Sequence, residues 1–496
     1  MAIVTQKKGG TAIPPTVKTV GFLAVVFMKA WEMARLLFES AKPVVRQKEE
    51  QTWEDNIDVA KYHDDQLSLD WGSNVPGSGA PEKIMVAAVQ ALENRGYIVS
   101  EKGYTLLRQG ISAFEAKDFI TLHKCSARLR YELANAKRDD TSDYWNFRYY
   151  VNFSDYQKSV SFPEAKPVDV KSSAFRDKIQ AGWLCQLIGG AMGTMVEGYS
   201  SQMLHDTFGD VYDFLREPNT YNDDITYELA FLDAFSEKSY GVTSEDIALA
   251  WVGHIPCGWS AEEIAIRNIK NGILPPESGQ FRNPFNEWIG AQMRGGICGM
   301  AAPGDPFRAA ELAWKDGSVS HANNGILGEV FAAVLTALSF THQNERDILK
   351  TAIGLIPADS EYRSVIDFAW ECCQTRENWR EALTDCEEKY KKYNWIHAYP
   401  NACCLVIALY YGHGDFTETL HIITMCGLDA DCNAGVLMPV IGISQGLSSI
   451  PQKYRHPAFE RLTTYMRGDY SEIKTEQLVD LTMSAVLKAQ GKQIDT

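Results

Sequence analysis

The sequence has little that would suit a membrane or a nucleic acid. Its apolar run at residues 20–27 is far shorter than the roughly 20 residues of a membrane-spanning helix, so we expect a buried helix there and no membrane. Acidic residues outnumber basic ones, with 64 Asp and Glu against 48 Lys and Arg, and the net charge is −16. Because nucleic acids are bound by clustered Lys and Arg, we do not expect one as a partner.

The cysteines also lack a recognisable pairing pattern. The eleven cysteines are odd in number, show no CxxC spacing and lie in apolar stretches, for example at Cys372, Cys373, Cys403 and Cys404. A disulfide framework would need an even set at regular spacing. We therefore expect reduced thiols and a cytoplasmic location.

The length of 496 residues predicts two domains. Residues 1–15, rich in Lys, Gly, Thr and Pro, are expected to be disordered, and residues 16–162 to form a small α+β domain. Within that domain, EKIMVAAVQALENRG predicts a helix that stops at Gly96, and YIVSEKGYTLLRQG predicts a hairpin that turns at Lys102 and Gly103.

A polar, Pro-containing connection leads into residues 173–489, whose character is different. Helical patterns such as DIALAWVGHI, AEEIAIRNIKNG and GILGEVFAAVLTAL follow one another across short turns marked by Gly or Pro. No alternating strand and no fixed repeat is apparent. The sequence predicts a mainly α fold, a multi-helix bundle with the smaller domain in front of it.

Two acidic clusters stand where polar turns give way to apolar helices. The first is Asn222-Asp223-Asp224, and the second is the run DADCN, with Asp429 and Asp431. Adjacent residues of a regular helix point about 100° apart, so such pairs converge only at a helix start, where the backbone leaves helical geometry. The positive end of the helix also stabilises ionised carboxylates there. Asp and Asn are, however, equally common as plain helix caps.

If the clusters meet, their chemistry is that of a cation site. Carboxylate and amide oxygens favour Mg²⁺, Mn²⁺ or Ca²⁺ over Zn²⁺. A third segment, residues 181–198, carries Gly182, Gly189, Gly190 and Gly193 at spacings that allow close helix packing, and it ends near Glu197. We expect this segment to bring Glu197 to the same place.

The order and spacing of these segments resemble the ADP-ribosylglycohydrolase family, which includes the dinitrogenase-reductase-activating glycohydrolase. GGAMG followed by Glu197 and Gly198 is similar to the family's first motif, NDDI at 222–225 to its second, and GLDADCNA at 427–434 to its last. Residues 290–294, 303–306 and 320–325 also look similar to intermediate segments of the family. The resemblance covers roughly residues 175–489.

The resemblance implies an orthogonal helical bundle that holds two Mg²⁺ ions, with Mn²⁺ as an alternative, and hydrolyses the bond at C1″ of an ADP-ribosyl group. The implied metal ligands are Asn222, Asp223, Asp224, Asp429, Asp431 and Cys432. The catalytic candidates, for positioning water and accepting its proton, are Glu197, Asp429 and Asp431. The candidates for binding ADP-ribose are Gly290, Arg294, His321, Asn324 and Gly427.

The sequence departs from the family pattern at several of these positions. Gly190 replaces the usual Asp of the first motif, Asn222 and Ile225 replace threonines of the second, and Ile289 stands where an Asn is common. These changes keep the carboxylates and leave the substrate open. Two alternatives therefore remain: hydrolysis of a nucleoside, nucleotide or modified-base ribosyl bond by the same site, and a non-catalytic family member.

The N-terminal domain carries no motif for chemistry. Its Lys and Arg residues form a modest basic region, which is more typical of a solvated face than of a binding patch: Lys102, Arg108, Lys117, Lys124, Arg128 and Arg130. We expect this domain to bind a protein partner or to form an oligomer contact.

Overall fold

The computed structural model describes residues 28–48 and 56–493, and the chain divides into two compact units, residues 1–63 and 64–496. In the first unit, α2 (Ala30–Ser40) is an amphipathic helix without buried residues. The boundary between the units falls within α3 (Asn56–Gly72). The predicted disorder of residues 1–15 and the predicted buried helix at 20–27 lie outside the described residues. The predicted domain boundaries, 16–162 and 173–489, stay a prediction.

The second unit begins with a small helical cluster around its own apolar core. Leu67 and Trp71 of α3 pack there with Val89, Leu107 and Leu129 from the three helices that follow. The elements of this part are α4 (Ile84–Asn94), β1 (Tyr97–Ile98), α5 (Glu101–Glu115), α6 (Phe119–Ala134), β2 (Lys137–Arg138) and α7 (Phe153–Ser159). The strands β1 and β2 pair antiparallel over only two residues each.

The hairpin predicted at Lys102 and Gly103 is wrong, because this stretch is the start of α5. Ser100 caps the helix by accepting a hydrogen bond from the Gly103 amide. The glycines serve close packing: a Cβ at Gly103 would lie 2.7 Å from Val99 Cγ1, and one at Gly110 would lie 2.0 Å from Trp71 Cη2. A glycine that marks a turn and one that admits a neighbour look alike in sequence.

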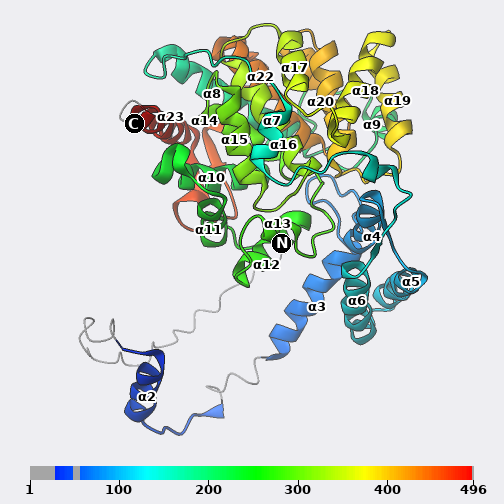
Figure 1. The fold of residues 1–496 in the computed structure, drawn as a ribbon, viewed down its shortest axis with the longest axis vertical. Coiled ribbons are helices and arrows are strands. Elements are labelled where there is room, and N and C mark those ends of the chain that lie inside the picture. Colours follow the sequence, from blue (N-terminus) through cyan, green and yellow to red (C-terminus); the bar gives the residue numbers. More distant parts are fainter. Residues whose placement is uncertain (1–27, 49–55, 494–496) are drawn as a thin grey trace. The chain divides into compact units, whose positions relative to one another are not determined.

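The remainder is a bundle of helices (Figure 1). Its helices are α8 (Ser173–Gly193), α9 (Ser201–Phe208), α10 (Asp224–Lys238), α11 (Ser244–His254), α12 (Ser260–Lys270), α13 (Glu277–Gln280), α14 (Gly295–Ala301), α15 (Pro306–Gly317), α16 (Asn324–Ser339), α17 (Glu345–Gly354), α18 (Glu361–Thr375), α19 (Trp379–Tyr390), α20 (Ala398–Tyr411), α21 (Phe416–Met425), α22 (Ala430–Gln445) and α23 (Thr475–Gln493). The predicted mainly α fold is confirmed, and the helical patterns singled out in the sequence coincide with α11, α12 and α16.

Two short strands correct the prediction that this part contains no strand. β3 (Arg461–Thr463) and β4 (Glu472–Lys474) pair antiparallel, with Leu462 opposite Ile473. Only the central residue of each strand is buried. Three residues are too few to show the alternating pattern by which a strand is predicted.

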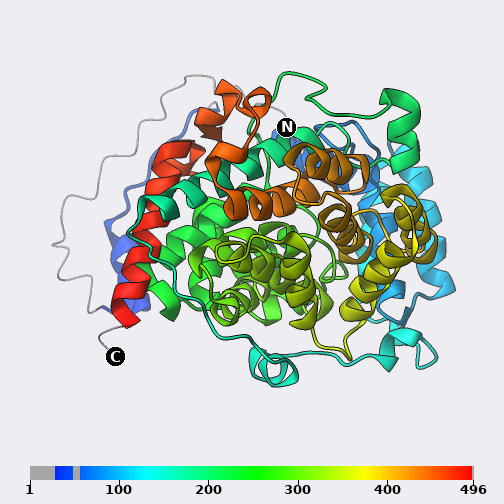
Figure 2. The ribbon, with the colours of Figure 1, turned by 90° about the horizontal axis from the view of Figure 1, so that it is seen from above.

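The core lies around two helices that are apolar on nearly all sides. Every residue of α16 is buried, and so is every residue of α22 except Gln445. A helix that is hydrophobic all round requires neighbours on every face. For α22 the main neighbour is α8, which lies beside it (Figure 1), while α23 packs along α8 and α10 at the edge of the bundle (Figure 2).

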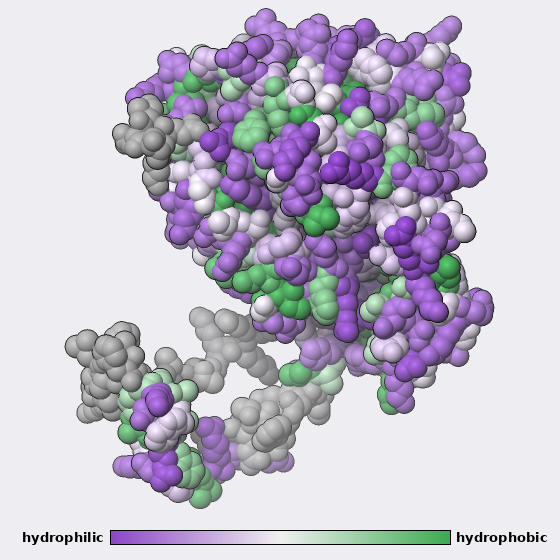
Figure 3. Space-filling model, viewed as in Figure 1, coloured by the Kyte–Doolittle hydropathy of each residue, from purple (hydrophilic) through white to green (hydrophobic). Residues whose placement is uncertain are grey.

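The surface of the protein is mainly hydrophilic. In the view of Figure 3, hydrophilic residues cover most of the surface, and hydrophobic ones form small separate groups. Within the described residues, no helix combines the length and the apolar composition that crossing a membrane requires.

Candidate functional site

The two acidic clusters occupy the first turns of α10 and α22. Asp223 and Asp429 are the N-cap residues, Asp224 is the first residue of α10, and Asp431 is the second of α22. Neither N-cap side chain makes the capping hydrogen bond to a backbone amide of its own helix. In α10 the local role falls to Asn222, whose Oδ1 accepts from the Asp224 amide at 2.7 Å. The plain capping interpretation therefore does not account for Asp223 and Asp429.

The two helix starts meet in space. Asn222 Nδ2 donates to Asp431 Oδ2 at 3.2 Å, and Cys432 Sγ donates to Asp224 Oδ1 at 3.2 Å. Donor atoms of Asp429, Asp431 and Cys432 all lie within 4.8 Å of one another. The exposed fractions of Asp224, Asp429 and Asp431 are 2%, 4% and 6%, whereas Asp223 is exposed. Three of the four aspartates are thus buried, and the cluster reaches solvent at Asp223.

Glycines of α8 allow this convergence. A Cβ at Gly189 would lie 2.4 Å from the carbonyl oxygen of Ala434, and one at Gly193 would lie 2.2 Å from the amide nitrogen of Asp431. The backbones of α8 and α22 are therefore in direct contact, as the small residues of this segment predict. The start of α22 rests on the end of α8, next to which Glu197 follows.

Glu197 is tied to the same place through the backbone. The Gly198 amide donates to the Leu428 carbonyl at 2.7 Å, and the Leu428 amide donates to the Tyr199 carbonyl at 2.8 Å. Gly198 and Gly427 have φ of +81° and +68°, values that glycine adopts without strain. The short strand-like pairing holds the residue after Glu197 beside the residue before Asp429.

The electrostatics of the cluster are those of crowded like charges. Burial, followed by repulsion from Asp431, raises the pKa of Asp224, Asp429 and Glu197 well above the usual range of carboxylic acids. Burial and then the charge of Asp223 raise the pKa of Asp431 to about 6. In addition, Asp429 Oδ1 is buried and has no hydrogen-bond partner among the described residues. No Lys or Arg in the described part of the chain forms a salt bridge with these carboxylates.

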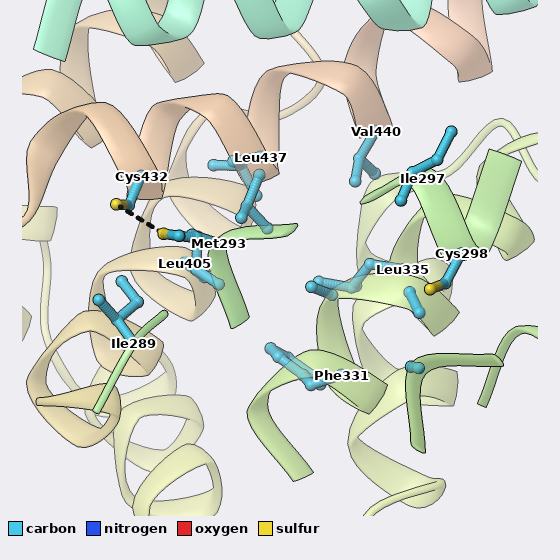
Figure 4. Close-up of a cluster of buried hydrophobic side chains, with 14 of the residues drawn as sticks. Ile289, Met293, Ile297, Cys298, Phe331, Leu335, Leu405, Cys432, Leu437 and Val440 are labelled. Carbon is cyan, nitrogen blue, oxygen red and sulfur yellow. Dashed lines mark hydrogen bonds between the residues drawn. The ribbon is translucent and has the colours of Figure 1, made fainter. Parts of the chain in front are cut away.

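Cys432 faces an apolar neighbourhood as well as the carboxylates. Its Sγ lies 3.7 Å from Met293 Sδ, within a cluster that includes Leu405 and Leu437 (Figure 4). Burial raises the pKa of the thiol well above its ordinary value, so Cys432 keeps its proton and donates a hydrogen bond to Asp224 Oδ1. Its assignment as a metal ligand stays a prediction.

The predicted substrate residues divide into two groups. Gly427 forms a backbone bridge with Ser200 beside the cluster. Arg294, His321 and Asn324 are completely buried and bind protein groups elsewhere. Asn324 donates to Glu287 Oε1 at 3.0 Å, and His321 Nδ1 lies 2.7 Å from Ser320 Oγ.

Arg294 is the centre of a buried ionic network. Its Nε donates to Asp316 Oδ2 at 3.0 Å, and its Nη1 donates to Glu262 Oε1 at 3.0 Å and to the Gly290 carbonyl. A Cβ at Gly290 would lie 1.9 Å from Glu262 Oε1, so the missing side chain makes room for this ion pair. The protein itself uses the contacts of Arg294 and Gly290, and their roles toward a ligand stay predictions.

Sequence reasoning missed Asn401, which fixes the start of α22 from α20. Its Oδ1 accepts from the Asp429 amide at 3.2 Å and from Asn433 Nδ2 at 2.7 Å, and its Nδ2 donates to the His397 carbonyl at 2.9 Å. The side chain is 0% exposed. The signal that could have revealed it is a single Asn within the otherwise apolar sequence of α20.

A helical bundle with a buried multi-carboxylate centre at two helix starts is the class that fold and site define. The sequence model of the family described as ADP-ribosylglycohydrolase matches residues 171–488, and the chain belongs to this family. A solved structure described as an ADP-ribosylglycohydrolase-related protein complex is 16% identical, with a TM-score of 0.46, and the match covers 64% of this chain and 100% of that one. No curated protein matches the sequence.

Proposed function

We propose that the protein hydrolyses the glycosidic bond at C1″ of an ADP-ribosyl group carried by a protein or a small molecule, with a divalent cation bound at the carboxylate cluster. The observation that carries the proposal is the meeting of Asp224, Asp429 and Asp431 in a buried place where none of them forms an ion pair with a Lys, Arg or His of the described residues. Family membership supports the class of substrate.

The residues present fit such a cation. The donors are carboxylate oxygens, the preferred ligands of Mg²⁺ and Mn²⁺. Asp429 Oδ1 is buried without a partner, which is costly unless a ligand satisfies it. Asp223, Asp224, Asp429 and Asp431 would hold two ions, and when bound these supply positive charge for the ribose hydroxyls and for an attacking water.

The chain's own groups then account for the remaining requirements. Cleavage of a ribosyl bond passes through an oxocarbenium-like state, which nearby carboxylates stabilise electrostatically. Glu197 forms no hydrogen bond with the described part of the chain, so its carboxylate is available to orient water and accept its proton. Burial raises the pKa of Glu197, which makes it a stronger base than an exposed glutamate.

The deciding experiment is Asp429→Asn, which keeps the shape of the side chain and removes one charge. We expect loss of Mg²⁺-dependent release of ADP-ribose from ADP-ribosyl-arginine or ADP-ribosyl-serine, weaker Mg²⁺ binding by calorimetry, and an unchanged helical circular dichroism spectrum. Asp65→Asn, at an exposed position of α3, is the matched control and should behave as wild type.

Equal wild-type turnover with and without EDTA would refute the cation, and full activity of Asp429→Asn would refute the site. Free nucleosides belong in the same substrate panel, because cleavage of these alone would shift the assignment to a nucleoside hydrolase. Calorimetric Mg²⁺ binding without turnover of any substrate would identify a non-catalytic family member.

A further inference from the structure

Residues 73–82, which precede the family segment, fold into a rigid loop. The Val75 amide donates to the Ala80 carbonyl, the Gly79 amide to the Val75 carbonyl and the Glu82 amide to the Ser73 carbonyl, each at 2.8 Å. Val75 and Ala80 are buried, at 3% and 0% exposed. The loop therefore has one side held against the bundle.

The segment that this side covers is 194–200, which carries Glu197. A Cβ at Gly77 would lie 2.2 Å from Thr194 Cγ2 and 2.4 Å from the Thr194 carbonyl oxygen, and one at Gly198 would lie 2.4 Å from Ala80 Cβ. Tyr199 Oη donates to the Ser78 carbonyl at 3.3 Å. The loop thus contacts the segment at Thr194 before Glu197 and at Gly198 and Tyr199 after it.

The opposite side of the same segment is fixed by the residues that lead into Asp429. The amides of Gly198 and Leu428 bind the carbonyls of Leu428 and Tyr199. The backbone around Glu197 is therefore enclosed between the 73–82 loop and the start of α22. If the loop moved, the backbone around Glu197 would lose its contacts on one of these two sides.

The end of the loop also reaches the electrostatics of the site. Glu82 accepts from Ser73 Oγ and from Trp259 Nε1, both at 3.0 Å, and is 9% exposed. Burial is the main cause that raises the pKa of Glu82 and that of Glu197; the charge of Asp223 adds to the first shift and the charge of Glu82 adds to the second.

We propose that the 73–82 loop is a positioning element of the site: it holds the backbone on both sides of Glu197 and thereby keeps the Glu197 carboxylate where the reaction needs it. The inference rests on the proposed function for its catalytic consequence. It assigns to the N-terminal part of the chain a role in the reaction through Glu197, with no contact to the reacting atoms required of the loop itself.

The test is Gly77→Ala in the full-length protein, since the added methyl collides with Thr194. We expect a fall in kcat of at least about tenfold, because small misplacements of catalytic groups are costly, with Mg²⁺ affinity unchanged by calorimetry. Gly253→Ala is the matched control, because a Cβ there has nothing within 4 Å. Kinetics of Gly77→Ala equal to those of Gly253→Ala would overturn the proposal.

A milder variant covers the case in which Gly77→Ala does not fold. Tyr199→Phe removes only the hydroxyl that binds Ser78, and it should lower kcat more than it changes KM.

Amide hydrogen exchange separates this inference from the proposed function. In Tyr199→Phe and Gly77→Ala, the Gly198 amide should exchange faster than in wild type and in Gly253→Ala. Absence of wild-type turnover would refute the hydrolase, while unchanged exchange at Gly198 would refute the loop's hold on the segment.

Discussion

At the scale of single residues, the carboxylates of the centre and those of the ionic network face opposite situations. Asp316 and Glu262 share the Arg294 guanidinium, whose positive charge offsets part of the effect of burial on their pKa. Asp224, Asp429 and Asp431 have no such partner among residues 28–48 and 56–493, and they repel one another. A protein keeps unbalanced buried charges at a cost to its stability, and such clusters are typical of functional sites.

The sequence indicated the ionic network of Arg294 poorly and the carboxylate centre well. Asp pairs at two helix starts are readable, because cap positions follow from the change of polar turn to apolar helix. The partners of Arg294 come from α12 and α15, and no local pattern states which distant acid a buried Arg will meet. The same limit hid Asn401 and Glu82.

A prediction at this scale concerns Glu228 of α10, which accepts a hydrogen bond from Gln186 at 2.7 Å. Burial raises its pKa from 4.5 to about 8. Between these values the folded state holds a proton that the unfolded state has lost, so this group's contribution to stability falls as pH rises, by up to about 1.4 kcal/mol per pH unit. Glu228→Gln should flatten the decline of the unfolding free energy from pH 5 to 8, measured by urea denaturation.

Glu237→Gln, at an exposed position of the same helix, is the control and should keep the wild-type slope. A slope in Glu228→Gln identical to that of wild type would show that Glu228 does not bind the extra proton.

At the scale of elements, the contact between α8 and α22 sets the geometry of the centre. Glycine costs a helix about 0.5–1 kcal/mol relative to alanine, yet Gly189 and Gly193 stand within α8. The contact that they permit places backbone against backbone, with Asp431 at its end. These glycines lower the helix propensity of α8, but they allow α22 to approach closely enough to place Asp431.

Gly193→Ala should therefore destabilise the protein by about 1–3 kcal/mol through overpacking and weaken Mg²⁺ binding, because the new methyl meets the Asp431 backbone. The measurements are thermal unfolding and calorimetry. Gly354→Ala, in a helix where a Cβ has nothing within 4 Å, is the control and should be neutral or slightly stabilising. A Gly193→Ala protein that binds Mg²⁺ as wild type does would contradict this account.

Helices long enough to repeat their apolar spacing several times were predictable, whereas strands of two or three residues were not. The patterns of α12 and α16 gave their helices correctly, because many residues repeat one spacing. The error at α5 arose where Gly103 was taken as a turn although it admits Val99. β3 and β4 were missed because three residues carry no period.

At the scale of the whole molecule, cation binding and folding should be linked. The centre is assembled from α8, α10 and α22, so an unfolded chain cannot offer it. A ligand that binds only the folded state stabilises it by about 2.7 kcal/mol at a concentration 100 times its Kd. Mg²⁺ should raise the melting temperature of wild type in differential scanning calorimetry, and EDTA should reverse the rise.

Asp431→Asn in the same titration, with NaCl at matched ionic strength, is the control. An equal rise in this variant would mean that Mg²⁺ acts on general surface charge and does not bind at the centre.

The route by which the chain reaches its centre has a consequence for synthesis. The ribosome synthesises α8, with Gly189 and Gly193, long before Asp429. These two glycines contact the backbone of α22, so their packing partner is missing until α22 has been made. A nascent chain that stops short of residue 429 lacks two of the four aspartates, Asp429 and Asp431. A nascent chain therefore cannot assemble this cluster of carboxylates until α22 has been synthesised.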